Sequence, residues 1–193
     1  GLAIQEIFGI DTLFGIDFFW VAAISLVVIT GLYTVIGGMK AVLWTSVLQT
    51  PVLLLGSFII LFVGLTKLGA GAGLMEGWAV MSEINGENMH LFRPIDDPDF
   101  PWPAVILGSV IIGSWYWCTD QYIVQRVLSG RDMTQARRGA IFGGYLKITP
   151  VFIFLVPGMI AYAMAEKGLL DLSGGANTAF PVMVRELLPA GIK

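Results

Sequence analysis

The sequence predicts an all-α polytopic membrane protein with about four transmembrane helices. Of its 193 residues, 56% are hydrophobic and only 13% are charged, and the mean hydropathy is +0.79. A soluble domain carries about 25% charged residues, so this chain has too few charges to cover a globular surface. Its apolar residues also occur in runs near the ~20 residues that cross a bilayer as a helix.

Composition and motifs exclude several classes of function. The net charge is −3 and there is no basic block, so we expect no nucleic-acid partner. The single cysteine, Cys118, cannot form an internal disulfide. Metal-ligand spacings, phosphate-binding glycine loops and a nucleophile elbow are absent, and His90 has no suitable partners nearby. We therefore expect neither an enzyme nor a bound cofactor or metal.

We expect residues 1–193 to form a single membrane domain. The chain begins at Gly1 without a methionine or signal peptide and ends at "LLPAGIK", which suggests an internal fragment of a longer, transporter-sized protein. Hydropathy places the spans at about residues 18–36, 42–65, 102–124 and 139–165. A "GGMK" turn joins the first two spans, and an outer loop at 66–101 and an outer tail at 166–193 complete the chain.

Charges between the spans predict the orientation. The first turn holds Lys40, and the loop before the fourth span holds Arg126, Arg131, Arg137 and Arg138 against one aspartate. The 66–101 loop is acidic. Positive charge near span ends marks the cytoplasmic side, so we expect the arginine loop inside and the acidic loop and both chain ends outside. The protein is then a multi-pass membrane protein.

The outer segments have structure of their own. The stretch "LMEGWAVMSEI" carries apolar residues at helical spacing, which predicts a short surface helix. The stretch "RPIDDPDFPWP" is broken by prolines and is expected to be extended, with Trp102 as an interfacial anchor. In the tail, "FPVMVRELLPAGI" again predicts a short amphipathic helix.

The third span carries the most informative segment, "WYWCTDQYIVQR". The Gly113-Ser114 pair just before it is a place where a helix can bend or unwind, as in transporter binding sites. Trp115, Tyr116 and Trp117 either form an aromatic belt or line a cavity. Their position more than halfway along the span favours the cavity, and aromatic faces flanked by hydroxyl and amide groups suit a sugar ring.

Lys147 lies about eight residues into the fourth span. That is about 12 Å of helix rise, too far for the side chain to reach the interface. Lys147 is therefore expected to face a cavity or an acceptor, and an ionisable residue at this depth marks a functional site. The alternative is a structural bond to a carbonyl of a broken helix.

Other polar residues fit either a structural role or a role in binding. Asp120 and Gln125 fit a capped helix end, while Gln121 is close enough to the aromatic residues to support them in binding. In the second span, Thr45 and Ser46 are small hydroxyl residues that favour helix packing.

These segments resemble the sodium/glucose cotransporter branch of the solute:sodium symporter family. The resemblance rests on "WYWCTDQYIVQR", "GGYLKITPVFIFLVPGMI", "GLYTVIGGMKAVLWTSVLQT" and "NTAFPVMVRELLP". It covers nearly the whole chain and is weakest in the acidic loop. It implies two inverted five-helix repeats with alternating access, in which the four spans are the fourth to seventh core helices.

The resemblance also implies roles for individual residues. Tyr116 matches the inner gate that stacks on the sugar, Trp117 supports it, and Lys147 matches a cationic sugar contact. Members often carry a polar residue at the position of Gly113 and an aspartate tied to cation coupling at the position of Ser46. Serine lacks that charge, so Ser46 is a weak candidate for a cation pathway. The family's shared sodium site lies in helices outside this chain.

The expected function is sodium-coupled symport of a sugar or similar polyhydroxylated solute across the plasma membrane. Its partners are then the solute, sodium as the coupling ion, and the lipid bilayer. One alternative keeps the family but changes the solute to an organic anion, amino acid or vitamin, which Lys147 could serve. A second alternative is a non-transporting sensor or a channel on the same fold.

Overall fold

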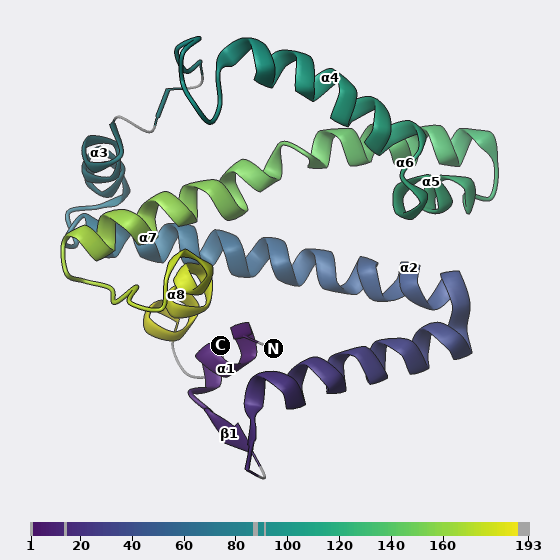
Figure 1. Ribbon diagram of the computed structural model, residues 1–193, viewed down its shortest axis with the longest axis horizontal. Coiled ribbons are helices and arrows are strands. Elements are labelled where there is room, and N and C mark those ends of the chain that lie inside the picture. The colour runs from purple at the N-terminus through teal and green to yellow at the C-terminus, as the bar shows by residue number, and fades with distance from the viewer. Residues whose placement is uncertain (1, 14, 87–88, 91, 189–193) are drawn as a thin grey trace. The chain divides into compact units, whose positions relative to one another are not determined.

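The computed structural model describes residues 2–13, 15–86, 89–90 and 92–188, and it is mostly helical. In chain order the elements are α1 (Leu2–Phe8), β1 (Thr12–Leu13), β2 (Ile16–Asp17), α2 (Phe18–Leu68), α3 (Leu74–Ile84), α4 (Trp102–Cys118), α5 (Gln121–Leu128), α6 (Met133–Leu146), η2 (Val151–Leu155), α7 (Val156–Glu166), η3 (Ala176–Thr178) and α8 (Ala179–Leu187) (Figure 1). The described residues form a large unit, within 1–85 and 149–193, and a small unit, within 86–148.

Helix α2 covers the first two expected spans in one helical run of 51 residues. The run reverses direction at Gly38, where the backbone leaves helical geometry (φ 56°, ψ −152°) (Figure 1). Only glycine adopts this conformation without strain. A Cβ added to the neighbouring Gly37 would lie 2.3 Å from the Cβ of Ala41, so the turn also needs a small residue there. The reversal expected at "GGMK" is confirmed.

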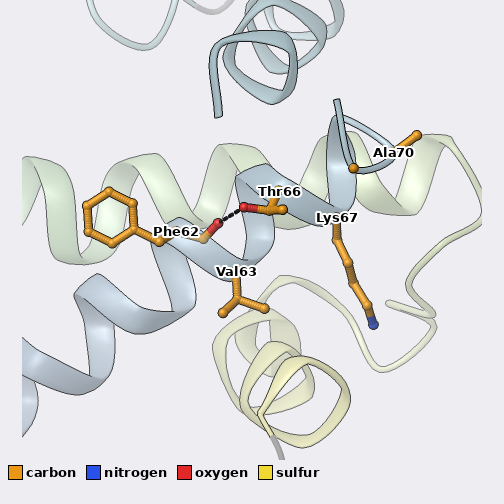
Figure 2. Close-up of a pocket in the computed structure, with 6 residues that line it drawn as sticks. Phe62, Val63, Thr66, Lys67 and Ala70 are labelled. Atoms are coloured by element: carbon orange, nitrogen blue, oxygen red, sulfur yellow. Dashed lines mark hydrogen bonds between the residues drawn. The ribbon is translucent and has the colours of Figure 1, made fainter. Parts of the chain in front are cut away.

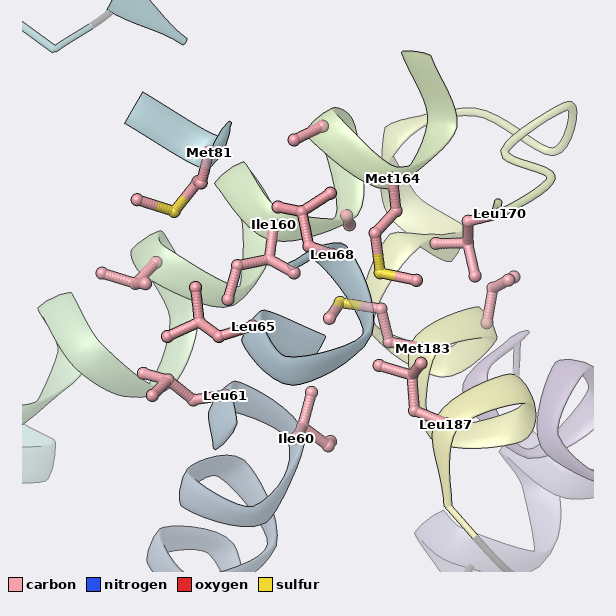
Figure 3. Packing of buried hydrophobic residues seen from close by; sticks show 14 of the residues in the cluster. Ile60, Leu61, Leu65, Leu68, Met81, Ile160, Met164, Leu170, Met183 and Leu187 are labelled. Carbon is pink, nitrogen blue, oxygen red and sulfur yellow. The ribbon is translucent and has the colours of Figure 1, made fainter. Parts of the chain in front are cut away.

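The large unit has one apolar core at the C-terminal end of α2 (Figure 3). Side chains from α2, α3, α7 and α8 meet there, and several of them are fully buried. The largest are Ile60, Leu68, Met81, Ile160, Met164 and Met183. This core ties together segments that lie more than 100 residues apart in the sequence, since α8 packs against α2 and α7.

Helix α3 confirms the short helix expected in the outer loop, with the bounds Leu74–Ile84. It packs directly on the backbone of α2: a Cβ added to Gly77 would lie 1.9 Å from the carbonyl oxygen of Leu65. At the end of α3, the buried Asn85 side chain donates to the carbonyl oxygens of Met81 (2.9 Å) and Met159 (3.2 Å). Asn85 therefore links α3 to α7.

The two ends of the described chain meet in the large unit. Arg185 of α8 forms an ion pair with Glu6 of α1, with 3.3 Å between Nη1 and Oε2. The helix expected in the tail is present from Ala179 to Leu187, and the rest of that expected stretch, 189–192, lies outside the described residues. Helix α1 and the antiparallel β1–β2 hairpin were not expected from the sequence.

The segment from Arg93 to Pro101 is folded back, so the expectation of an extended segment is wrong. An isolated bridge pairs Arg93 with Pro101. Inside the loop, Oδ1 of Asp97 accepts hydrogen bonds from the backbone N–H groups of Asp99 (3.0 Å) and Phe100 (2.8 Å), and Oδ2 pairs with Arg93 (3.3 Å). The Phe100 hydrogen bond is the main cause that holds the pKa of Asp97 below its ordinary value.

The third expected span is broken, but not at Gly113. Helix α4 runs unbroken through Gly113 and Ser114 to Cys118, and the chain leaves helical geometry at Thr119 before α5 begins at Gln121. The predicted break at Gly113-Ser114 is therefore wrong in position by about six residues. The Ser114 hydroxyl donates to the carbonyl of Val110 (2.8 Å), so it is bonded within the continuous helix.

The fourth expected span is also divided. Helix α6 begins at Met133, before the expected start, and ends at Lys147 as its C-cap residue. A π-helical turn, η2, follows Pro150, and α7 continues to Glu166. The runs Phe18–Leu68 and Met133–Glu166 are long and apolar enough to cross a membrane, and α4 is apolar but shorter. The number of about four transmembrane helices stays a prediction.

Candidate functional site

Tyr116 and Lys147 meet in the small unit. The ammonium nitrogen of Lys147 lies 3.5 Å from the centroid of the Tyr116 ring. Tyr116 belongs to the last turns of α4, and Lys147 caps the end of α6, so the two residues come from different helices. The face of an aromatic ring carries negative potential and attracts a cation, most strongly where water is scarce. Lys147, which is otherwise exposed, thus contacts the Tyr116 ring, and the expectation that it faces a cavity or an acceptor stays a prediction.

Trp117 extends this cluster. Its ring stands edge-on to the ring of Tyr116, with 5.4 Å between the centroids and 79° between the planes. Trp117 also lies near α6, because a Cβ added to Gly143 would lie 3.9 Å from its Cη2. Tyr116 is half-buried, and Trp117 is 39% exposed. The aromatic cluster (Tyr116, Trp117 and Lys147) is therefore accessible on part of its surface, as a binding surface must be.

The helix break positions the cluster. At the end of α4, the carbonyl oxygen of Trp115 accepts three hydrogen bonds, from the N–H of Thr119 (2.9 Å), the N–H of Asp120 (3.0 Å) and the hydroxyl of Thr119 (2.9 Å). Asp120 then starts α5, because its Oδ1 accepts from the N–H of Ile123 (3.1 Å). The capping role that the sequence favours for Asp120 is confirmed, at the start of α5, but the local charge pair expected with it is absent from the described part of the chain.

Gln121 follows this break directly as the first residue of α5, and its side chain is exposed. Among the residues that the structure describes, no hydrogen bond joins its amide to Tyr116, Trp117 or Lys147. Three of the four expected solute-contacting residues thus lie together, and Gln121 lies five residues further along the chain from Tyr116.

Ser46, the weak candidate for a cation pathway, belongs to the large unit. Its hydroxyl donates to the carbonyl oxygen of Val42 (2.9 Å), and the hydroxyl of Thr45 donates to the same oxygen (3.0 Å). Both hydroxyl protons are therefore used inside α2, in the back-bonding that serine and threonine often make in helices. The packing role that the sequence favours for these residues stays a prediction, because these bonds lie within one helix.

A second cation–aromatic pair was missed in the sequence. The guanidinium carbon of Arg126 lies 3.9 Å from the centroid of the Tyr122 ring, and Nη2 donates to the hydroxyl of Tyr122. The four-residue spacing of Tyr122 and Arg126 on one helix was the signal that could have found it. Arg126 is therefore paired with Tyr122 on the same helix.

The large unit contains a cavity of about 540 Å³ at the end of α2, lined by Phe62, Val63, Thr66, Lys67, Ala70 and Gly71 (Figure 2). Its polar groups are bonded to the protein: the Thr66 hydroxyl donates to the carbonyl of Phe62 (2.8 Å), and Lys67 donates to that of Glu186 (3.4 Å). The lining offers few free donors or acceptors, so it does not suit a polyhydroxylated solute.

The sequence is similar to known transporters over almost its whole length. Residues 6–193 match the sodium:solute symporter family. The chain is 34% identical over 197 residues to the sodium/glucose cotransporter 4 of Danio rerio. This alignment covers 90% of the present chain and 30% of that relative. It is 35% identical over 207 residues to the sodium/glucose cotransporter 1 of Sus scrofa (93% and 31%). The sodium/myo-inositol cotransporter 2 of Mus musculus is 34% identical over 197 residues (90% and 29%). The chain therefore spans about 30% of the length of these curated relatives.

Proposed function

Because the chain belongs to the sodium:solute symporter family, we propose that it is part of a sodium-coupled symporter for a sugar or similar polyhydroxylated solute. The relatives named above are cotransporters of glucose or myo-inositol, both of which are polyhydroxylated rings. The protein would span the plasma membrane several times, within a fold of two inverted five-helix repeats. Transport by such a fold needs no covalent chemistry.

The observation that carries the solute class is the pairing of Tyr116 with Lys147. A sugar ring can place its C–H groups on an aromatic face while its hydroxyl groups accept hydrogen bonds from an ammonium. The aromatic cluster supplies both chemistries within one small region. In this proposal Tyr116 stacks on the solute and acts as the gate, Trp117 supports the Tyr116 ring, and Lys147 donates to a solute hydroxyl.

Sodium would couple to the solute by shifting the balance between two states. Sodium binding favours the outward-open state and completes the solute site. The protein then closes toward the outside before it releases sodium and solute to the inside. The sodium ligands are expected mostly in parts of the protein beyond this chain. Gln121 remains a candidate for a second contact with the solute.

The same site also supports one alternative substrate class. Lys147 carries a positive charge that would suit a carboxylate, so an organic anion, an amino acid or an acidic vitamin is the second candidate. A non-transporting sensor or a channel on the same fold makes different predictions, since neither accumulates solute against a gradient.

The test uses the full-length protein that contains this chain, reconstituted in vesicles with an imposed sodium gradient. We expect sodium-dependent accumulation of labelled glucose or myo-inositol, and little uptake of labelled carboxylates. Tyr116→Ala should abolish this uptake, while Tyr162→Ala, a partly exposed tyrosine on α7, should leave it unchanged. Accumulation of a carboxylate alone would replace the sugar assignment. Sodium-driven uptake that survives in Tyr116→Ala would refute the gate role.

A further inference from the structure

A basic surface surrounds the junction of α5 and α6 in the small unit. Four arginines occur within 13 residues of sequence, at positions 126, 131, 137 and 138. The one acidic residue among them, Asp132, uses Oδ1 to accept from the N–H of Gln135 (2.8 Å) and so caps α6. Arg131, Arg137 and Arg138 are exposed and form no ion pair with any residue in the described part of the chain. Their charge is available to a partner.

A small cavity lies within this surface. Its volume is about 210 Å³, and Arg126 and Gln135 line it together with small side chains of α5 and α6. This volume holds more than one water molecule and has room for a phosphate group. Gly130, one of the lining residues, has no room for a side chain, because the end of α5 and the start of α6 are close together. A Cβ added to Gly130 would lie 3.2 Å from the carbonyl oxygen of Val127 and 3.3 Å from Cα of Ala136.

Arg126 is prepared for such a ligand. Its guanidinium is held on the Tyr122 ring and bonded to the Tyr122 hydroxyl, so little side-chain freedom remains to be lost on binding. A planar guanidinium donates to phosphate oxygens in pairs, and hydrogen bonds between two charged groups are the stronger kind. The neutral amide of Gln135 adds a further donor to the same cavity.

The chain on both sides of this surface exposes apolar side chains. None of the residues of α4 is buried, and Ile111 and Leu107 are about 70% exposed. On α6, Ile141 and Phe142 are more than 60% exposed, three and four residues after Arg138. Exposed apolar helices that run into an arginine cluster are typical of a segment that passes from the hydrocarbon core into the headgroup layer.

We propose that the cavity at Arg126, Gln135 and Ala136 binds the phosphate headgroup of an anionic phospholipid in the cytoplasmic leaflet. Arg126 would donate to the phosphate, the exposed arginines would attract the lipid, and its acyl chains would lie along the apolar faces of α4 and α6. This site uses none of the residues assigned to the solute, so it does not depend on which solute is carried.

The test is a titration of the full-length protein in detergent, followed by native mass spectrometry. The probes are dioctanoyl phosphatidic acid, dioctanoyl phosphatidylcholine and inorganic phosphate. We expect phosphatidic acid to bind about tenfold or more tightly than phosphatidylcholine, as one lost charge-assisted hydrogen bond would require. Inorganic phosphate should compete weakly, because it lacks acyl chains.

Two variants distinguish lipid binding in the cavity from nonspecific attraction of the lipid by the arginines. Arg126→Gln removes the charged donor, and Ala136→Leu fills the cavity without changing any charge. Both should lose the preference for phosphatidic acid, while Arg93→Gln and Thr134→Leu, which lie outside the cavity, should keep it. A protein that does not distinguish the two lipids would overturn the proposal. So would an Ala136→Leu variant that binds phosphatidic acid normally, or inorganic phosphate that displaces the lipid at equal concentration.

Discussion

At the scale of single residues, the candidate solute site depends on the contact between Tyr116 and Lys147. Lys147 stands out in the sequence because an ionisable residue is unusual deep in an apolar segment. Tyr116 stands out within an aromatic cluster and because it matches the inner gate in the family resemblance. Their separation of 31 residues carries no geometric information, and the 3.5 Å contact between them depends on how α4 and α6 are arranged. The Tyr122–Arg126 pair could have been predicted, because both residues lie on one helix face.

The Lys147 contact gives a prediction for transport. Lys147→Ala should raise the apparent KM for the solute by about tenfold or more, because a hydrogen bond to a charged group contributes about 1.5–3 kcal/mol. The maximal rate at saturating solute should change less than KM. The measurement is sodium-driven uptake in vesicles at several solute concentrations, normalised to protein in the membrane.

Lys167→Ala is the matched control, because Lys167 is an exposed lysine that caps α7. A Lys147→Ala protein that reaches the membrane in smaller amounts but has an unchanged KM would show a structural role for Lys147.

At the scale of elements, the sequence located most helices and misplaced one break. It predicted α3, the start of α8 and the reversal at Gly38, because each has a strong local signal. It placed the break of the third span at Gly113, where glycine merely permits bending. The structure places it at Thr119 and Asp120, where side-chain hydrogen bonds end one helix and start the next. The η2 turn had no signal beyond the nearby prolines.

The position of the break can be tested by hydrogen exchange. Asp120→Ala should accelerate exchange of the amide of Ile123 by about fivefold, because loss of a helix cap typically costs about 1 kcal/mol. Asp120→Asn should largely preserve the cap. Gly113→Ala should have no accelerating effect, since a Cβ at Gly113 meets no atom within 4 Å. Faster exchange in Gly113→Ala, without faster exchange in Asp120→Ala, would show that the helix breaks at Gly113 instead.

The contact of α3 with α2 gives a second prediction. Gly77→Ala should lower the stability of the protein by about 1–3 kcal/mol, because the new methyl group would collide with the backbone of Leu65. Gly56→Ala on α2 is the control, because a Cβ there meets no atom within 4 Å. Thermal unfolding in detergent measures both. If the Gly77→Ala variant melts at the same temperature as the unsubstituted protein, α3 can move away from α2 without loss of stability.

At the scale of the whole molecule, composition predicted a membrane protein, and membership of the sodium:solute symporter family agrees with it. The sequence could not predict that the described residues form two compact units, because that division depends on contacts between distant segments. The runs Phe18–Leu68 and Met133–Glu166 contain three of the expected spans, and that each of these crosses a membrane stays a prediction. The orientation rests on charge alone.

The orientation predicts which loops face the cell exterior. In a Cys118→Ser background of the full-length protein, without other reactive cysteines, Asp96→Cys should react with a membrane-impermeant thiol reagent added outside intact cells. Ser129→Cys, beside Arg131 in the arginine loop, should react only after the membrane is permeabilised. The opposite pattern would invert the predicted topology.

The reversal at Gly38 has a consequence for synthesis of the protein. Two long apolar helices follow each other with one non-helical residue between them, and only Lys40 supplies charge at the turn. With one non-helical residue between them, the two helices have no intervening loop, so we expect them to enter lipid together as one hairpin. A missense change at Gly38, whose backbone conformation only glycine adopts without strain, is expected to disturb that hairpin and to lower the amount of protein that reaches the membrane.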